Sequence, residues 1–397
     1  MLPPRARTVA NARSACVPGR TRRTTGVPRA PAVRSGVRAA VRAAGGSRAG
    51  GLGTDVAASG AAARLTESAD ARMTDTPHEV HSIQRLIERL HARHAELDEG
   101  EVATYIPELA KADPRAFGIA VASAQGRIFE VGDAQVPFTI QSVSKPLVFG
   151  LAVETLGHDA VLAHVDVEPS GDAFNSIQLQ PGTNRPFNPL INAGAIAVAG
   201  ALHARFGDEA FGMTLERLGE AAGRRLELDE TVYRSESATG HRNRAIGHLL
   251  LNFGRIETDV EAALDLYFRQ CSILVTARDL AVIGATLSNM GQNPLTGREV
   301  FDIRAVKDML SIMFTCGMYD YSGQWAYRVG VPAKSGVSGG VMAVVNRQLG
   351  IAAWSPRLDA RGNSRRGVEV CVGLADELGL HAFDCMNFGS SYLKAVL

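Results

Sequence analysis

The chain has 397 residues, 46% hydrophobic and 21% charged, a composition typical of a globular protein with enough apolar side chains for a large core. Its net charge of +1 combines two opposed parts, because residues 1–72 carry thirteen Arg and three acidic residues, while the rest carries 29 basic and 38 acidic ones. The acidic remainder lacks the basic patch of a nucleic-acid-binding protein, and five scattered cysteines without C-x-x-C spacing argue against a disulfide framework or a zinc site and suit a reducing cytosol.

Residues 1–72 form a leader rich in Arg, Ala, Gly, Pro and Ser, without aromatic side chains. Such a segment buries too little apolar surface to offset its ordering entropy, so we expect it to be disordered. Three interpretations stay open: a basic arm for an acidic partner, an organelle transit peptide, or an upstream extension of a protein that starts at Met73. We favour the third, with a folded domain over residues 73–397 in the cytoplasm, because no continuous apolar run typical of a secretory signal is present.

The next segments predict a helix and then strands. Apolar residues recur at the helical period over 83–90. Two segments, 117–122 and 126–132, then predict a β-hairpin, since the second alternates after a turn signal. A further extended piece over 137–141 ends at Ser142, where a helix is expected to begin.

Residues 146–310 mostly show a helical pattern broken by loops rich in Gly, Pro and Asn, and strands return at 339–345 and 349–355. Antiparallel strands at both ends with helices between them predict an α+β architecture with a helical lobe. The longest apolar run, 190–202, is too short for a membrane span and is interrupted by Asn192.

Ser142 and Lys145 form an S-x-x-K motif at this strand-to-helix junction. Residues three apart share one helix face, so Lys145 can reach the Ser142 hydroxyl and, if burial lowers its pKa, act as the base that a serine nucleophile needs. Pro146 cannot sit deep in a helix, which puts Ser142 at the N-terminal end, where backbone N–H groups favour developing negative charge. We give no function to a second S-x-x-K match, Ser391 to Lys394.

Lysine is scarce in this chain, with only five, so a retained lysine suggests a task that arginine cannot perform. Lys334 begins a K-[ST]-G motif before an apolar strand. S-x-x-K and K-[ST]-G together are the signature pair of penicillin-recognising serine hydrolases, in which the K-[ST]-G strand helps to form the oxyanion hole. Taken alone, Lys334 would be a solvated charge at a strand end. No histidine has the local signature of a Ser-His-Asp base.

Residues from about 80 to 390 resemble the serine-dependent glutaminases, which share the β-lactamase-like fold. The matching segments include Y-I-P-E-L-A-K from Tyr105, F-T-I-Q-S-V-S-K-P from Phe138, E-P-S-G from Glu168, N-P-L-I-N-A-G-A-I from Asn188, Y-R-S-E from Tyr233, Y-F-R-Q-C-S from Tyr267, C-G-M-Y-D from Cys316 and K-S-G-V from Lys334. So many ordered matches make the resemblance specific, and they span nearly all of the chain beyond the leader.

The resemblance implies that Ser142 is the nucleophile and Lys145 its proton partner, with Tyr105 and Tyr319 lining the reacting centre and one of them moving a proton. It places the backbone N–H groups of Ser142 and Val337 at the carbonyl oxygen. The implied substrate pocket consists of Asn192, Glu236, Asn243 and Tyr267. Taken singly, these side chains could equally be a helix cap, core residues or buried structural groups, and only the joint pattern favours the pocket.

The implied reaction is hydrolysis of the side-chain amide of L-glutamine to L-glutamate and ammonia, through a serine ester and without a metal or organic cofactor. Glu236 can pair with the substrate ammonium, and amide and phenol donors can hold its carboxylate. The resemblance also suggests a homodimer or homotetramer. His241 stands where some family members carry an acid, which alters the charge beside Asn243, but we expect activity to survive.

Rival functions stay open. A β-lactamase or peptidase on the same fold would share both motifs but would need an export signal. A catalytically silent glutamine sensor would keep the pocket, and the intact Ser142 and Lys145 argue against it. Binding of nucleic acid rests on residues 1–72 alone.

Overall fold

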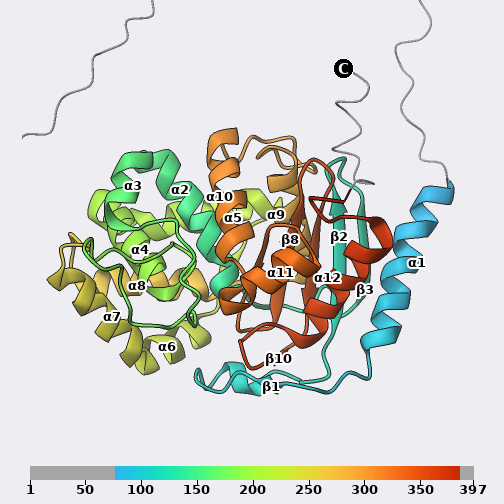
Figure 1. The fold of residues 1–397 in the computed structure, drawn as a ribbon, viewed down its shortest axis with the longest axis horizontal. Helices are drawn as coiled ribbons and strands as arrows, with labels where there is room; N and C mark the ends of the chain where they lie inside the picture. The colour runs from blue at the N-terminus through green and yellow to red at the C-terminus, as the bar shows by residue number, and fades with distance from the viewer. Residues whose placement is uncertain (1–76, 385–397) are drawn as a thin grey trace, which may run out of the picture. The chain divides into compact units, whose positions relative to one another are not determined.

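The computed structural model describes residues 77–384, with side chains from Ile83 onward. The leader predicted over residues 1–72, the proposed start at Met73 and the second S-x-x-K match lie outside the described residues. Within them the chain is a mixed α+β fold, as predicted, with one five-stranded antiparallel sheet, two small sheets and helices packed around them (Figure 1).

The five-stranded sheet has the order β3-β2-β9-β8-β7, and all neighbouring strands are antiparallel. Its strands are β2 (Gly118–Ser123), β3 (Ile128–Gly132), β7 (Ala333–Ser335), β8 (Gly340–Val345) and β9 (Leu349–Trp354). The predicted hairpin is confirmed, since β2 pairs with β3, and the two strands predicted over 339–345 and 349–355 are present as β8 and β9, which also pair antiparallel. The sheet therefore joins an early segment of the chain to a late one.

Helices cover both faces of this sheet, which explains why β8 and β9 are apolar throughout rather than alternating. In β2, Ile119 and Val121 pack with α1 (Pro77–His94) and α12 (Arg365–Leu378), which lie along one face in Figure 1. The alternate residues, Ala120 and Ala122, belong to the cluster on the other face, which contains α9 (Ala277–Ser288).

A glycine allows α9 to lie directly on β9. A Cβ at Gly350 would stand 2.3 Å from both Ala281 O and Ala285 N of the helix. No side chain fits in that space, so the close contact between helix and sheet depends on this residue.

The predicted helical region is confirmed and forms a lobe beside the sheet, seen in green to yellow in Figure 1, with α10 in orange. Its helices are α2 (Lys145–Leu156), α3 (His158–His164), α4 (Asn192–Phe206), α5 (Glu209–Ala222), α6 (Glu230–Thr239), α7 (His241–Asn252), α8 (Val260–Cys271) and α10 (Ile303–Cys316). A three-stranded sheet of order β4-β6-β5 is formed by β4 (Phe138–Thr139), which precedes α2, and by β5 (Glu227–Leu228) and β6 (Ile273–Val275), which lie between helices of the lobe in the sequence. The remaining elements are β1 (Glu101–Val102), β10 (Arg357–Leu358), α11 (Ser322–Arg328) and the short 3-10 helices η1 (Leu109–Lys111), η2 (Gln141–Ser144) and η3 (Tyr319–Tyr321).

A buried arginine attaches the segment that carries Tyr105. The guanidinium of Arg366, on α12, donates hydrogen bonds to the carbonyl oxygens of Ala95, Leu97 and Arg115 at 2.9, 2.9 and 3.0 Å. The segment from Leu97 to Arg115, which contains Tyr105, is therefore attached at both ends to α12.

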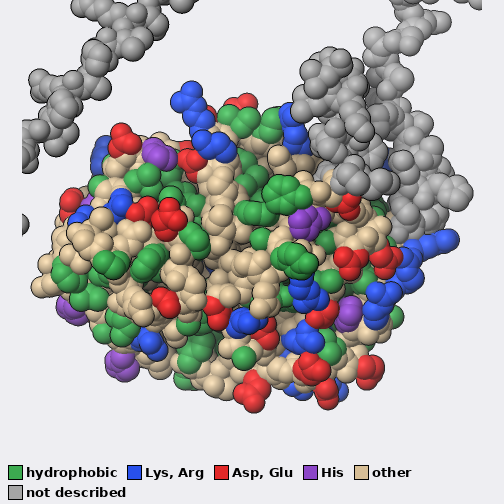
Figure 2. Space-filling model, in the orientation of Figure 1, with side chains coloured by type: hydrophobic (Ala, Val, Ile, Leu, Met, Phe, Trp, Pro, Cys, Tyr) green, Lys and Arg blue, Asp and Glu red, His purple; other side chains and the backbone are tan. Residues whose placement is uncertain are grey.

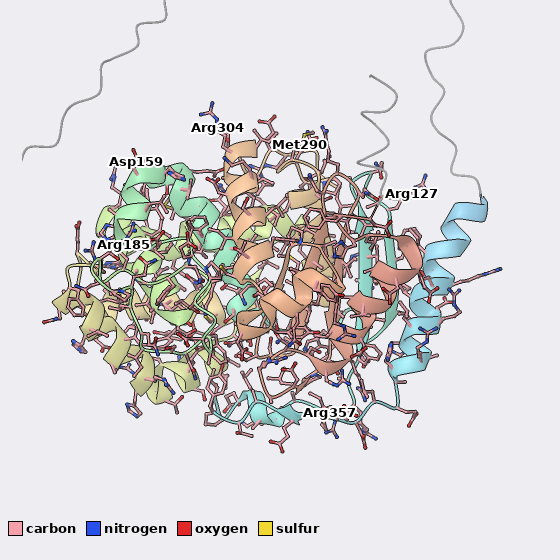
Figure 3. All side chains as sticks on the ribbon, viewed as in Figure 1. Arg127, Asp159, Arg185, Met290, Arg304 and Arg357 are labelled. Atoms are coloured by element: carbon pink, nitrogen blue, oxygen red, sulfur yellow. The ribbon has the colours of Figure 1, made fainter. Side chains whose placement is uncertain are left out.

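The face of the described part seen in Figure 2 carries acidic and basic side chains intermixed rather than in a patch of one sign. In Figure 3 charged side chains such as Asp159 and Arg304 project outward from the helices. None of the helices between residues 77 and 384 combines the length and apolarity that a membrane crossing requires.

Candidate active site

Ser142 lies on η2, a tight turn between β4 and α2. The predicted strand-to-helix junction is thus present, but a 3-10 turn carries the serine and α2 begins only at Lys145. Gln141 has a φ of +48°, which is uncommon for a residue with a side chain and marks backbone strain beside the serine. Pro146 is in the first turn of α2, where its missing N–H leaves no hydrogen bond unmade.

Lys145 is buried among polar groups. Its Nζ donates to Asn192 Oδ1 at 2.7 Å and lies 5.7 Å from the centre of the Tyr267 ring, and no direct hydrogen bond joins it to Ser142 among the described contacts. Burial lowers the pKa of Lys145 to about 8, against the opposing effects of Cys271 and Glu236. With that pKa, about a tenth of the amine is neutral at pH 7 and able to accept a proton.

The hydrogen bond from Lys145 continues across the helical lobe. Asn192 is the first residue of α4, and its Nδ2 donates to Asn243 Oδ1 on α7 at 3.0 Å. Its backbone N–H donates to Phe174 O at 2.9 Å, and its side chain makes no capping hydrogen bond. The helix-cap interpretation of Asn192 is therefore wrong, and the two asparagines extend the polar network away from the lysine.

Glu236, on α6, presents a buried carboxylate to the same region. Gln141 Nε2 donates to its Oε2 at 3.3 Å, and no Lys or Arg among the described side chains forms an ion pair with it. Burial raises the pKa of Glu236 to about 7, while the Gln141 hydrogen bond and the charge of Lys145 pull it down. A buried carboxylate without a cationic partner is a ready position for a positively charged ligand group.

One buried tyrosine lies near the lysine and another near the serine. Tyr267, on α8, contacts Lys145 as described, and burial raises the pKa of its phenol well above the ordinary value. Tyr319, in η3, has a φ of +58° and donates to Ser335 O at 2.8 Å. Burial raises the pKa of Tyr319 too, and a hydrogen bond with Ser142 partly counters the shift. Tyr319 is therefore the phenol in contact with the serine hydroxyl.

The K-S-G motif runs beside the serine turn. A Cβ at Gly336 would stand 3.1 Å from Ile140 O, so the glycine permits the close approach of the two segments. The backbone N–H groups of Ser142 and Val337 have no hydrogen-bond partner among the described residues. Two free N–H groups at this junction are the donors that an oxyanion would need.

Lys334, the first residue of that motif, is not the solvated strand-end charge that it would be on its own. Its side chain is 0% exposed, and its Nζ donates to Gly317 O at 3.0 Å and to Ser335 O at 2.6 Å. The amine also lies 4.0 Å from the centre of the Tyr319 ring. Burial, then the nearby Lys145, lowers the pKa of Lys334 well below its ordinary value. Ser335 O thus accepts from both Tyr319 and Lys334.

Tyr105 differs from the other candidates because its side chain is 54% exposed. Its hydroxyl is nevertheless enclosed by the protein, and this burial raises the pKa of Tyr105 well above the ordinary value. The charges of Glu236 and Tyr319 raise the pKa further, which shows that the hydroxyl lies near these two site residues. It therefore lies at the edge of the group, between the buried centre and solvent.

The structure thus brings the predicted residues together from distant parts of the chain, with Tyr105 at the rim.

Sequence reasoning did not single out Gln141 or Cys271. Gln141 directly precedes the serine, and its left-handed φ leaves no signal in the sequence. Cys271 is a free, buried thiol that interacts with Ser144 and Tyr267. Among the described residues no three His, Cys, Asp or Glu side chains cluster as a metal site would require.

Comparison with known proteins gives a consistent result. A protein-family model described as Glutaminase matches residues 100–383. The Glutaminase of Nostoc sp. is 51% identical over 306 residues, which cover 77% of this chain and 92% of that protein. The Glutaminase of Corynebacterium glutamicum is 46% identical over 301 residues, covering 75% of this chain and 72% of that protein.

Solved structures agree with these sequence relatives. Mglu in its glutamate form superposes with a TM-score of 0.73 at 42% identity, over 76% of this chain and 69% of that chain. The probable glutaminase ybaS superposes with a TM-score of 0.74 at 38% identity, over 76% of this chain and 98% of that chain.

Proposed function

The chain belongs to the glutaminase family and is an enzyme that hydrolyses glutamine, and on that premise we propose that the reaction proceeds through an acyl-enzyme on Ser142. We assign its fold to the β-lactamase-like class, because a serine at a helix start faces a K-S-G strand edge. The observation that carries the proposal is the buried group of Ser142, Tyr319 and a lysine, Lys145, whose pKa is lowered to about 8.

In the proposed binding step, Glu236 pairs with the α-ammonium of L-glutamine. Its carboxylate is buried and has no cationic partner among the described side chains, so the substrate would supply the missing charge. Asn192, Asn243 and Tyr267 lie on three helices of the same lobe and would hold the α-carboxylate. A site that fixes both ends discriminates strongly against analogues that lack either.

In the acylation step, the Ser142 hydroxyl attacks the δ-amide carbon and its proton passes to neutral Lys145, with Tyr319 as relay. The contact between Tyr319 and Ser142 supports this route, since Lys145 has no direct hydrogen bond to the serine. The N–H groups of Ser142 and Val337 stabilise the oxyanion. Protonation of the leaving nitrogen by the same groups releases ammonia and leaves a γ-glutamyl ester on Ser142.

In the deacylation step, water attacks the ester carbonyl and gives up a proton to the same base, which releases L-glutamate and restores the Ser142 hydroxyl. Tyr105, at the rim, is the second phenol that could move a proton. We assign that role to Tyr319 instead, because it is the one that contacts the serine.

The test is ammonia release by the full chain from L-glutamine, with L-asparagine and D-glutamine beside it. We expect release from L-glutamine alone, and a loss of at least about 10³-fold in Ser142→Ala. Acid-quenched enzyme should carry a γ-glutamyl adduct on the peptide containing Ser142, detectable by mass spectrometry.

Other outcomes identify the rivals. A folded Ser142→Ala variant that keeps its activity would exclude the acyl-enzyme. Hydrolysis of nitrocefin would favour a β-lactamase, and a folded wild-type chain that binds L-glutamine without releasing ammonia would be a sensor.

A further inference from the structure

Two residues beside the reacting serine have a strained backbone. Among the described residues, the non-glycine residues with a positive φ are Gln141, Asn184, Met290, Tyr319 and Arg347. Gln141 directly precedes Ser142, and Tyr319 carries the phenol that contacts the Ser142 hydroxyl. Both lie in short 3-10 helices, η2 and η3. A left-handed conformation persists at such residues only where neighbouring contacts hold it, so these contacts bear on the reaction.

The same kind of contact holds both residues. The Ser144 hydroxyl donates to Gln141 O at 2.8 Å, and the Ser322 hydroxyl donates to Tyr319 O, also at 2.8 Å. Each serine follows its strained residue by three positions and is buried, with 0% of Ser144 and 6% of Ser322 exposed. A serine hydroxyl that bonds a nearby carbonyl stabilises a local turn against regular structure. We call each pair of a left-handed residue and the serine bonded to its carbonyl a serine latch.

The latch at Tyr319 has a second hydrogen bond. The Ser322 hydroxyl also accepts from the Met318 N–H at 3.0 Å, so it bonds the backbone before and after the Tyr319 Cα. Met318 is buried, and its N–H would lose this partner together with the hydroxyl. An unpaired buried N–H is costly, so the turn would move to avoid it. The latch at Gln141 is connected to the site through Cys271, which interacts with Ser144.

The other three left-handed residues lack such a contact. Each is followed three positions later by a residue without a hydroxyl, namely Phe187, Asn293 or Gly350. In the described part of the chain, a serine latch therefore accompanies backbone strain only at the two positions beside Ser142. This distribution connects the latches with the reacting centre rather than with strained turns in general.

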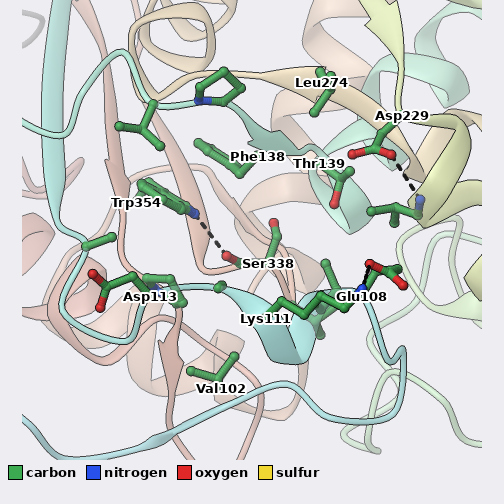
Figure 4. A pocket seen from close by; sticks show the side chains of 18 of the residues that line it. Val102, Glu108, Lys111, Asp113, Phe138, Thr139, Asp229, Leu274, Ser338 and Trp354 are labelled. Carbon is green, nitrogen blue, oxygen red and sulfur yellow. Dashed lines mark hydrogen bonds and ion pairs between the residues drawn. The ribbon is translucent and has the colours of Figure 1, made fainter.

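The segments next to the two latches are fixed by tryptophans. In β4, before η2, the Phe138 ring stacks on Trp354 with centres 5.0 Å apart, and Trp354 Nε1 donates to Ser338 O at 3.0 Å (Figure 4). In α11, after η3, the fully buried Trp325 donates to Val331 O at 2.7 Å. Because these neighbouring segments are fixed, the short turns are the parts that can relax, and the serine hydroxyls oppose that relaxation.

We propose that Ser144 and Ser322 are positioning residues for the reaction. Their hydroxyls hold Gln141 and Tyr319 in the left-handed conformation and so keep the Tyr319 phenol in contact with the Ser142 hydroxyl. One latch acts on the turn that carries the nucleophile, and the other acts on the turn that carries the proton relay. This inference rests on the relay through Tyr319 proposed above, and neither serine has a part in that mechanism.

Substitutions at Ser322 separate the effect of the hydroxyl from that of side-chain volume. Ser322→Thr keeps the hydroxyl, and the cavity of about 270 Å³ that Ser322 lines leaves room for the added methyl group. Ser322→Cys keeps a similar shape but has only a weak thiol donor. In the full chain, kcat for L-glutamine should stay near the wild-type value in Ser322→Thr. It should fall by at least about 10-fold in Ser322→Cys and Ser322→Ala with little change in KM, because the Tyr319 phenol moves the proton.

The latch at Gln141 has a different kinetic signature. Gln141 also donates to Glu236, which pairs with the substrate ammonium in the proposed binding step. Ser144→Ala should therefore lower kcat and raise KM for L-glutamine, each by about 3- to 10-fold, the effect of a weakened hydrogen bond. A change in kcat with an unaltered KM would overturn the assignment of Ser144.

Ser288→Ala is the matched control. Ser288 is as fully buried as Ser144, and its hydroxyl donates to Ala285 O, three positions earlier, at 2.9 Å. Ala285 lies within α9 and has no positive φ, so this bond holds no strained residue. Ser288→Ala should lower Tm to a similar extent as Ser322→Ala and leave kcat unchanged. An equal fall of kcat in the two variants would make the effect a general loss of stability and overturn the proposal.

Crystal structures of the variants test the conformation without reference to activity. In Ser322→Ala the φ of Tyr319 should become negative and the phenol should leave Ser142, whereas Ser322→Thr should keep the wild-type backbone. A folded Ser322→Ala variant with normal kcat, or with an unmoved Tyr319, would overturn the latch. Activity that is kept in Ser322→Cys and lost in Ser322→Thr would do so too. Ser322→Cys, which preserves the packing, takes the place of Ser322→Ala if that variant does not fold.

Ser142→Ala, measured beside these variants, keeps the two possible failures apart. Activity that remains in folded Ser142→Ala would overturn the proposed function. An inactive Ser142→Ala together with a fully active Ser322→Ala would overturn the latch alone.

Discussion

Glu236 and Lys145 are buried ionisable side chains whose pKa values move toward each other. Burial disfavours charge on both, which raises the pKa of Glu236 to about 7 and lowers that of Lys145 to about 8. The proposed reaction needs Glu236 charged and Lys145 neutral, so both groups must lose a proton before the free enzyme can act.

The value of kcat/KM for L-glutamine should therefore rise between pH 6 and pH 9, across the pKa values of about 7 and about 8 of these two groups. Below this range Glu236 is protonated and cannot pair with the substrate ammonium, and Lys145 is charged and cannot take the serine proton. The measurement is steady-state ammonia release across this range. A flat or falling profile would contradict the assignment.

Glu236→Gln is the matched variant for the same experiment. It should remove the step near pH 7 and leave the step that belongs to Lys145. Its KM should rise by about 10- to 100-fold, the effect of losing a charged hydrogen bond. A variant with unchanged KM would mean that Glu236 does not bind the substrate.

Lys334 should matter for activity more than for stability. Its Nζ shares the carbonyl of Ser335 with the Tyr319 hydroxyl, so Lys334→Met should loosen Tyr319 and lower kcat by about 10²-fold, as expected for impaired proton transfer. Both carbonyls that accept from Lys334 keep another donor, since Ser335 O accepts from Tyr319 and Gly317 O accepts from the Ser335 N–H, so Tm should change little. A large loss of Tm with normal kcat would make Lys334 a structural residue only.

At the scale of elements, the contact between α9 and β9 holds the sheet against the helices. Gly350→Ala should lower the free energy of unfolding by about 3 kcal/mol or more, because the added Cβ would stand 2.3 Å from backbone atoms of α9. Gly212→Ala, inside α5, is the control: its Cβ meets nothing within 4 Å and should stabilise the protein by about 0.5–1 kcal/mol. Denaturant titration of both variants measures the difference, and equal effects would contradict this account.

For the whole molecule, we expect a homodimer or homotetramer. Tyr327 and Phe383 are large apolar side chains that are strongly exposed, the kind of residue that subunit contacts often cover. Light scattering of the full chain should give a mass of two or four copies, and serine at both positions should weaken the association. A monomer at micromolar concentration would show the expectation to be wrong.

The sequence was informative where the signal is local or where a motif is long. Alternation and turn residues predicted the hairpin of β2 and β3, and the spacing of Ser142 and Lys145 predicted a serine at a helix start. The cytoplasmic location and the roles of the site residues stay predictions.

Contacts between distant segments could not be predicted from spacing. The hydrogen bond of Lys145 goes to Asn192, forty-seven positions away, rather than to the serine three positions away. The burial of Lys334 depends on packing against Gly317 and Tyr319, which no local pattern records. In both cases the deciding factor is which partners the fold supplies to a buried amine.

The left-handed backbone at Gln141 and Tyr319 has a consequence for evolution and engineering. Each residue holds a conformation that costs about 1–3 kcal/mol for a side chain other than glycine, and both lie next to the Ser142 hydroxyl. Glycine would relieve this strain, but at Tyr319 it would also delete a buried ring, which costs about 3–5 kcal/mol and outweighs the gain. The packing that holds the Tyr319 ring therefore also maintains the strained backbone, so variants that loosen this packing should release the strain and displace the phenol from Ser142 together.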